Sequence, residues 1–303
     1  MARVRVVTDS TAAFEDPHFP QAYGVTVVPL SIHLGSHVLR DGIDIDAEEM
    51  LQRLPHLTAP PQLIAPPVGA FEAAYHELGR TTDQICVVVH SQHFTDTYAN
   101  AQTARSTLLG RCEIMVIDSR TTSAGLGYLV EATVQAAEAG LPLDDVVRVA
   151  RGIIPRLYSV FYVSTLDYIR QAGLIGEAQS TLGRMLGIKP LLTIEDGRLI
   201  TMEKARTHAQ AIDKIMEFVT EFTHIDRLCI LQNTLRITEQ TQMLRERLAL
   251  EFTSRVQAPV TLYGPLLASR IGSDAMGLVI MEGDTAALPP DRPTALVNLN
   301  RGM

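Results

Sequence analysis

Tryptophan is absent from this 303-residue sequence, and aromatic residues make up only 5% of it. Proteins that bind single-stranded nucleic acid usually stack bases on aromatic side chains. The formal net charge of −8 is also opposite in sign to the basic surface that attracts a phosphate backbone. We therefore expect no nucleic-acid partner.

Cysteine is scarce as well, and the three cysteines lie far apart in the chain at Cys86, Cys112 and Cys229. Their number is odd, and no Cys-x-x-Cys pair is present. A disulfide framework or a zinc knuckle needs closely spaced or paired cysteines. Cys86 lies in an apolar run, where a buried and unreactive thiol is the simplest interpretation.

Several common catalytic motifs are missing: the GxSxG elbow, the phosphate-binding Walker A loop and HExxH. His33 with His37, and His90 with His93, have spacings at which two histidines could share a metal ion. No third ligand stands at a suitable spacing near either pair, and a protein zinc site needs at least three. We therefore expect neither a metal site nor a cofactor.

Long hydrophobic runs are also absent. No stretch approaches the roughly 20 apolar residues that a membrane-spanning helix needs. The N-terminal sequence MARVRVVTDS lacks the apolar region of a secretory signal and turns into a strand at once. We expect a cytoplasmic protein without stable membrane insertion.

The most informative feature that is present occurs three times: a short apolar run stops at a turn rich in hydroxyl groups. Val4–Val7 lead into TDST, Ile85–Val89 lead into HSQHFTDT, and Ile114–Ile117 lead into DSRTTS. Each turn is followed by helical sequence. In an open parallel sheet the carboxyl ends of the strands meet at one edge, where ligands bind. The pattern predicts a doubly wound α/β sheet with a polar site at that edge.

These turns also have a purely structural interpretation. Serine, threonine and aspartate after a strand cap the next helix by accepting hydrogen bonds from its free N–H groups. Thr95 or Asp96 can do so in the central turn. Capping accounts equally well for any one turn, but three turns at one edge favour a ligand site.

Composition divides the chain into three parts. We predict a doubly wound α/β domain over residues 1–158, a smaller α+β domain over 159–283 and a disordered tail over 284–303. In the second part, IEDGRL over residues 194–199 carries the Asp-Gly pair typical of a tight β-hairpin. The glycines of GLG at 125–127 follow a strand, but without a third glycine they indicate close helix packing rather than a dinucleotide site.

The order of several segments resembles the DegV family of bacterial fatty-acid-binding proteins. The first half contains TDST, GAFEAAY, FTDTYANA and VIDSRTTSAGLG, in that order. The second half contains STLDYIRQAGLIG, LLGIKPLLTIEDGRL, EKARTHAQAIDKI and YGPLLASRIGSDAMG. The resemblance covers about residues 3 to 282, and it identifies the chain as a divergent member.

The resemblance implies a fold and a function. It implies a doubly wound N-terminal domain, a C-terminal α+β domain and an acyl chain lying in a tunnel between or beneath them. The carboxylate would be held at the mouth by hydroxyl groups and a basic side chain. Members of this kind do no chemistry themselves and present the carboxylate to a separate fatty-acid kinase. We therefore expect a non-catalytic carrier of a long-chain fatty acid or related lipid, with no catalytic residues.

The resemblance also implies the site residues. The serine that holds the head group in the family falls at Thr95, and the following glycine is replaced by Asp96. The basic histidine of the family falls at Arg270, and Arg206 of the KxRT motif is retained. Further residues of the expected site are those of the site floor, Thr8, Ser10 and Ser119, and those of an unusually apolar tunnel mouth, Leu63 and Ile64.

These departures leave alternatives open. Arg270 could pair with Asp96 and leave Thr95, Ser119 and Arg206 to hold an ordinary fatty acid. We prefer a head-group site rebuilt for another amphiphile, or one that no longer hands its lipid to a kinase. A different class of function is an enzyme acting on a small hydroxylated or phosphorylated ligand, with Asp9 and Asp118 as acid or base. A third possible function is that of a scaffold that binds a partner and whose tunnel is filled by its own side chains.

Overall fold

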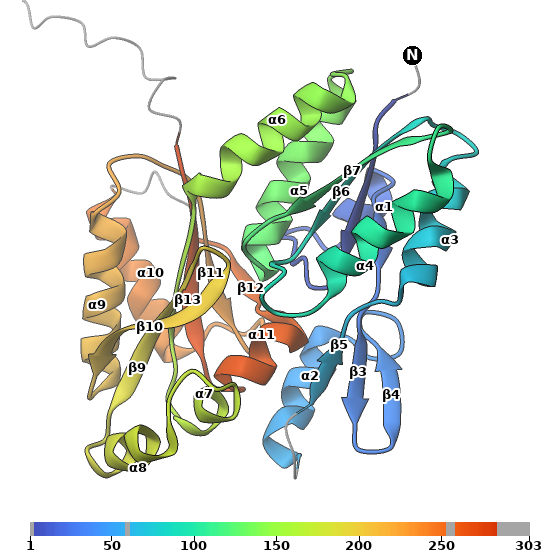
Figure 1. The fold of residues 1–303 in the computed structure, drawn as a ribbon. Coiled ribbons are helices and arrows are strands. Elements are labelled where there is room, and N and C mark those ends of the chain that lie inside the picture. Colours follow the sequence, from blue (N-terminus) through green and yellow to red (C-terminus); the bar gives the residue numbers. More distant parts are fainter. Residues whose placement is uncertain (1–2, 58–60, 253–257, 284–303) are drawn as a thin grey trace, which may run out of the picture.

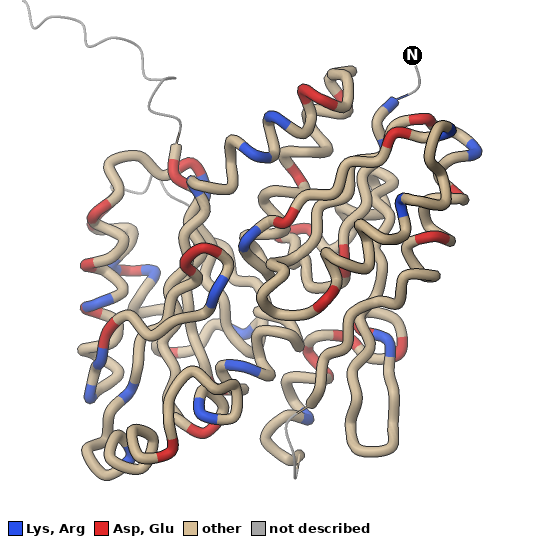
Figure 2. The backbone as a smooth tube through the Cα atoms, viewed as in Figure 1, with Lys and Arg blue, Asp and Glu red and all other residues tan. Residues whose placement is uncertain are grey.

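The computed structural model describes residues 3–57, 61–252 and 258–283, so the tail predicted over 284–303 lies outside the described residues. The described chain forms two halves, each built on its own large sheet, with a small third sheet beside them (Figure 1). Acidic and basic residues are interspersed over both halves (Figure 2). Among the described helices, none combines the length and apolar composition needed to cross a membrane.

The first half is a parallel sheet with strand order β2–β1–β6–β7. The strands are β1 (Arg5–Asp9), β2 (Thr26–Val28), β6 (Gln84–Val89) and β7 (Glu113–Asp118). Its helices are α1 (Phe19–Ala22), α3 (Val68–Leu78), α4 (Thr97–Ala104), α5 (Ser123–Glu138) and α6 (Leu143–Ile153), with a short 3-10 turn, η2 (Arg105–Leu108), after α4.

Helices cover both faces of this sheet because alternate residues of each strand point to opposite faces. On β6, Cys86 and Val88 pack with α5 and α6, whereas Val87 and Val89 pack with α3 and α4. The doubly wound α/β fold predicted from the three apolar runs is therefore confirmed.

The apolar sequence GVTVVPLSI over residues 24–32 does not form one strand. It breaks after β2, at Pro29, which has no N–H to donate to a sheet. The chain then enters a small antiparallel sheet with order β4–β3–β5, formed by β3 (Ser31–Leu34), β4 (His37–Arg40) and β5 (Gln62–Ile64). Between β4 and β5 lie α2 (Ala47–Arg53), capped by the Asp46 side chain, and the 3-10 turn η1 (Leu54–His56).

The second half is a six-stranded sheet with order β10–β9–β8–β13–β11–β12. Its strands are β8 (Leu157–Tyr162), β9 (Lys189–Glu195), β10 (Arg198–Ala205), β11 (Ile225–Gln232), β12 (Val260–Leu262) and β13 (Met276–Glu282). Neighbouring strands run antiparallel except β11 and β12. Its helices are α7 (Asp167–Gln171), α8 (Glu177–Met185), α9 (His208–Thr220), α10 (Glu239–Glu251) and α11 (Gly264–Ile271), and the 3-10 turn η3 (Ile154–Arg156) leads into it. This is the expected α+β half.

The predicted hairpin joins β9 to β10. Its central residues, Asp196 and Gly197, have φ values of 46° and 80°. Positive φ at both positions is the geometry of the type I′ turn that favours Asp-Gly. β10 continues to Ala205, and the next helix, α9, begins at His208. Thr207 caps that helix by accepting a 3.1 Å hydrogen bond from the backbone N–H of Gln210.

One hydrophobic core joins the two halves. Its buried side chains come from α2, α5, α7, α11 and the second sheet, and they include Met50, Leu54, Tyr128, Phe161, Ile169, Leu231 and Leu267. We call this set the shared apolar cluster. Phe94 of the first half and Leu63 on β5 of the small sheet are partly buried and pack against it. The cluster therefore reaches the edge of the parallel sheet where the three polar turns lie.

Candidate functional site

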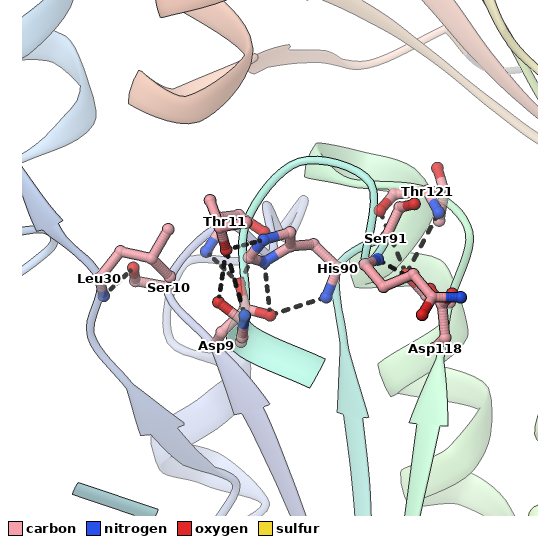
Figure 3. A network of polar contacts seen from close by, with 12 residues as sticks. Asp9, Ser10, Thr11, Leu30, His90, Ser91, Asp118 and Thr121 are labelled. Atoms are coloured by element: carbon pink, nitrogen blue, oxygen red, sulfur yellow. Dashed lines mark hydrogen bonds and ion pairs between the residues drawn. The ribbon is translucent and has the colours of Figure 1, made fainter. Parts of the chain in front are cut away.

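The three polar turns meet at the carboxyl edge of the parallel sheet. The backbone N–H of His90, after β6, donates to Asp9 Oδ2 at 2.7 Å, at the end of β1. The backbone N–H of Ser91 donates to the carbonyl of Thr121, after β7, at 2.9 Å. Figure 3 shows these contacts as one network across the three strand ends. The sequence pattern therefore located the polar edge correctly.

Asp9 is the anchor of this network and is fully buried. Its Oδ1 accepts hydrogen bonds from the Thr11 backbone N–H at 2.9 Å and from the Thr11 hydroxyl at 2.7 Å. Burial raises the pKa of Asp9. The charge and hydrogen bonds of His90 and the hydrogen bond from Thr11 lower this pKa by more, so it lies below the ordinary value of 3.8. Asp9 is therefore ionised and only accepts hydrogen bonds.

His90 connects Asp9 to Thr95 and is also fully buried. Its Nδ1 lies 3.0 Å from Asp9 Oδ2, although the ring N–H does not point straight at that oxygen. Its Nε2 lies 2.9 Å from Thr95 Oγ1. Sequence reasoning considered His90 only as a partner of His93, which is exposed. The described residues hold no group of three side chains placed to share a metal ion.

Thr95 is the partly exposed end of this chain of contacts. Its Oγ1 accepts from the Thr97 backbone N–H at 3.3 Å and lies 2.8 Å from Thr97 Oγ1. Thr95 therefore contacts the first turn of α4. Asp96 stands at the N-cap position, but its side chain makes no capping hydrogen bond and is exposed.

Arg270 approaches the same loop from α11 of the second half. Its Nη2 donates to the carbonyl of Phe94 at 3.4 Å, and its Nε is buried without a hydrogen-bond partner. Arg270 and Asp96, both described, do not form an ion pair. The alternative in which Arg270 pairs with Asp96 is therefore not what the structure shows. Arg270 thus contacts the residue that precedes Thr95, at the border of the shared apolar cluster.

The expected floor residues lie at the same sheet edge, and two of them, Ser10 and Ser119, make hydrogen bonds within the protein. Ser119 is buried, and its hydroxyl donates to the Thr121 carbonyl at 3.2 Å. Ser10 donates to Asp41 Oδ2 at 2.8 Å and accepts from the Leu30 N–H at 3.0 Å. The Thr8 hydroxyl is buried without a partner.

Leu63, Ile64 and Arg206, the remaining expected residues, differ in their burial and in their distance from the polar edge. Leu63 faces the shared apolar cluster, whereas Ile64, on the opposite side of β5, is 43% exposed. Arg206 is exposed and follows β10, at the end of the β9–β10 ladder opposite the Gly197 turn. The structure therefore places Leu63 against the shared apolar cluster, but not Ile64 or Arg206.

Asp41 is a buried carboxyl beside Ser10 that sequence reasoning missed. It is 4% exposed, and burial raises its pKa from 3.8 to about 7, with the charge of Asp9 adding to the rise and the Ser10 hydrogen bond opposing it. The only signal in the sequence is its position just after a strand, in DGIDID, which is shared with Asp44 and Asp46. A carboxyl with a strongly shifted pKa at a sheet edge is typical of functional sites.

One cavity adjoins the shared apolar cluster, and a larger cleft adjoins the polar turns. A cavity of about 300 Å³ between α7, α8 and the β9–β10 ladder is lined mainly by aliphatic side chains, among them Leu166, Ile169, Leu174, Ile175 and Ile188. Leu166 and Ile169 belong to the shared apolar cluster, so this cavity opens on it. A larger open cleft of about 1090 Å³ lies between the halves, lined by Asp118, Arg120 and Arg151 among others, and it does not include Thr95 or Arg270.

The hairpin turn of the second half closes over the polar edge. The Ser91 hydroxyl donates to the Gly197 carbonyl at 2.7 Å, and Arg120 pairs with Asp196 at 3.2 Å. A side chain at Gly197 would overlap the Ser91 hydroxyl, and the positive φ of Gly197 disfavours any other residue. Both reasons favour glycine at this position. Ser91 and Gly197 thereby hold the two halves in register at the site.

Fold and site define a class: a doubly wound α/β half whose strand ends meet an apolar core shared with an α+β half. The family model described as "Uncharacterised protein, DegV family" matches residues 3–283. A DegV domain-containing protein of Caldanaerobacter subterraneus is 30% identical over 287 residues, which cover 93% of this chain and all of that protein. One from Mycobacterium tuberculosis is 31% identical over 292 residues, 95% of this chain and 99% of that one. The chain belongs to the DegV family, as the sequence motifs predicted.

Solved structures agree with this assignment. A structure titled as the fatty acid binding of a DegV family protein from Thermus thermophilus is 27% identical, with a TM-score of 0.80, covering 93% of this chain and all of that one. DegV from Bacillus subtilis, described as a fatty acid binding protein, has a TM-score of 0.79 over the same shares of the two chains. At 21% identity, it supports the fold alone.

Proposed function

We propose that this protein is a non-catalytic carrier of a long-chain fatty acid or related lipid. Thr95 and Arg270 hold the head group, and the shared apolar cluster surrounds the tail. The protein presents the head group to a partner such as a fatty-acid kinase in the cytoplasm, with residues 1–158 and 159–283 as its two domains. The observation that supports this most is that Thr95 and Arg270, from different halves, meet at Phe94 where polar edge and apolar core join.

Burial of the tail supplies most of the affinity. Each buried methylene contributes roughly 0.8 kcal/mol, so a long alkyl chain gains on the order of ten kcal/mol before the cost of lost freedom. The cavity of about 300 Å³ beside α7 and α8 lies at the small end of the size range of ligand pockets. An extended chain reaching it from Phe94 has to part side chains of the shared apolar cluster. We therefore expect α7 and α8 to move when lipid enters.

The free donor of Arg270 favours an acidic head group. A buried hydrogen-bond donor without a partner costs about 1–3 kcal/mol, and more when it is charged. The Nε of Arg270 is such a donor. A carboxylate or phosphate between Arg270 and Thr95 would satisfy it with a charge-assisted hydrogen bond. Asp96 is exposed, so water screens its repulsion of that anion.

The proposal is tested by native mass spectrometry of the purified protein. We expect an added mass that corresponds to one long-chain acid or related lipid, and we expect the delipidated protein to take up palmitate. A protein that is recovered empty and also ignores palmitate would contradict the proposal.

Replacing Arg270 with glutamine should weaken palmitate binding by about 10- to 100-fold, because a charge-assisted hydrogen bond is lost. Arg206→Gln is the matched control, since Arg206 is exposed and outside the site. Its affinity, measured by displacement of a fluorescent fatty acid, should stay within twofold of the wild type. Equal losses in both variants would show that general positive charge, and not a contact from Arg270, holds the ligand.

One observation favours the enzyme alternative. Asp9, His90 and Thr95 stand in the order of a carboxylate–imidazole–hydroxyl triad. The Thr95 oxygen, however, already accepts a hydrogen bond from the Thr97 backbone N–H. The His90 Nδ1 lies near Asp9 but is not aligned for a hydrogen bond to it. We therefore regard Thr95 as a binding hydroxyl. Hydrolysis of an acyl ester that Thr95→Val abolishes would reverse this preference.

A further inference from the structure

The last strand of the parallel sheet, β7, has one open edge. Among the described strands it pairs only with β6. The backbone N–H groups of Glu113 and Ser119 donate to carbonyls at the two ends of β6. Because the backbone groups of successive strand residues point to alternate sides, those of Ile114, Val116 and Asp118 point away from β6. An edge of unpaired N–H and C=O groups is a template for one more strand.

This open edge borders the large cleft between the halves. Val116 and Asp118 line that cleft of about 1090 Å³, and Ile114 lines a smaller pocket of about 430 Å³ further along the same edge. Apolar side chains of the β9–β10 hairpin, Ile194 and Ile200, also line the cleft. An occupant could therefore form backbone hydrogen bonds with β7 and bury apolar side chains against both halves.

The described chain stops at Gly283, beside this cleft. Just before that point, the carbonyl of Glu282 accepts from Arg156 Nε at 2.7 Å, and its carboxylate accepts from the Tyr158 hydroxyl at 3.4 Å. Tyr158 itself lines the cleft. Residues 284–303 follow in the sequence and lie beyond the part that the DegV family model matches. This extra segment therefore starts next to the cleft.

One part of the extra segment has the sequence of a short strand. Residues 295–299 read ALVNL, contain neither proline nor glycine and are apolar at 295, 297 and 299. All the prolines of the segment, which favour the disorder predicted for it, lie within residues 284–294. Fully extended, residues 284–294 span up to about 36 Å, whereas β7 is roughly 20 Å long. The connection is therefore long enough to reach any point of the open edge.

We propose that residues 295–299 bind in the cleft as an added strand on the open edge of β7. Five residues match the stretch from Ile114 to Asp118, which supplies the outward-facing backbone groups. A tethered segment has an effective concentration in the millimolar range, so even a strand too short to bind tightly as a free peptide can occupy an edge in this way. The bound segment contacts both halves and adds a link to the one between Ser91 and Gly197. This inference goes beyond the proposed function and does not depend on it.

Hydrogen–deuterium exchange, resolved to single amides by mass spectrometry, tests the proposal on the full chain. The amides of Ile114, Val116 and Asp118 should exchange at least tenfold more slowly in the wild type than in Val297→Pro, because a proline at the centre of the added strand cannot donate to β7. Ala287→Pro is the matched control, since it adds a proline outside residues 295–299, and it should exchange like the wild type.

A chain that ends at Gly283 is the second variant, and it should exchange like Val297→Pro. In all four proteins the amides of Glu113, Met115 and Ile117, which face β6, should stay slow and so report that the sheet is intact. Equal exchange at Ile114 and Val116 in the wild type and the shortened chain would overturn the inference.

Two further outcomes separate the possible explanations. Slow exchange in the wild type that becomes fast on tenfold dilution would assign the edge to a second copy of the chain, and it would also overturn the inference. Failure of all four proteins to bind palmitate would overturn the carrier function, whereas the inference about β7 would stand if the amide pattern is as expected.

Discussion

Replacing Gly127 with alanine should destabilise the protein by about 2–4 kcal/mol or prevent its folding. Gly127 lies in α5, and an added Cβ would overlap the backbone carbonyl of Ala13. A backbone atom cannot rotate away as a side chain can, so α5 would have to move off the segment that follows β1. Overpacking of this kind usually costs 1–3 kcal/mol, and more when the backbone itself is the obstacle.

Urea unfolding followed by circular dichroism measures this loss. The control is Gly69→Ala in α3, an exposed glycine with no atom near its added Cβ. That variant should gain about 0.4–1 kcal/mol, because alanine loses less backbone freedom in a helix. If Gly127→Ala is as stable as Gly69→Ala, α5 is not packed on Ala13 as the structure shows.

Replacing Asp41 with asparagine should stabilise the protein above pH 7 by up to about 4 kcal/mol and change little near pH 4. Folded Asp41 has a pKa of about 7 because it is buried, against 3.8 for the ordinary group. Between these values the folded protein holds a proton that the unfolded chain has released. Its stabilising contribution is therefore complete below pH 4, falls as the pH rises and is gone above pH 7. Asparagine cannot ionise, so it escapes this loss.

The check is the difference in unfolding free energy between wild type and Asp41→Asn at pH 4, 5.5 and 8. Other titrating groups contribute to both proteins and cancel in the difference. Asp44→Asn is the control, because that exposed carboxyl pairs with Arg40, which lowers its pKa to about 2. An advantage of Asp41→Asn that does not grow with pH would show that Asp41 is not buried as an acid.

Local sequence predicted much of the fold because the signals are short-range. Burial of β6 on both faces follows from an unbroken apolar run, and the Asp196-Gly197 turn follows from the φ values that this pair favours. Gly127 was expected to serve close packing, and it does. Pro29 also acts locally: it has no N–H to donate, and the apolar run around it is divided between two sheets at that point.

The sequence by itself determined the family, the two kinds of sheet and the edge at which polar turns gather, since each rests on motifs or on patterns a few residues long. Only the tertiary structure decided the partners at that edge. His90 meets Asp9 across 81 residues, and Arg270 meets Phe94 across 176. Such pairs carry no local signal, because only the burial and packing of distant segments bring them together.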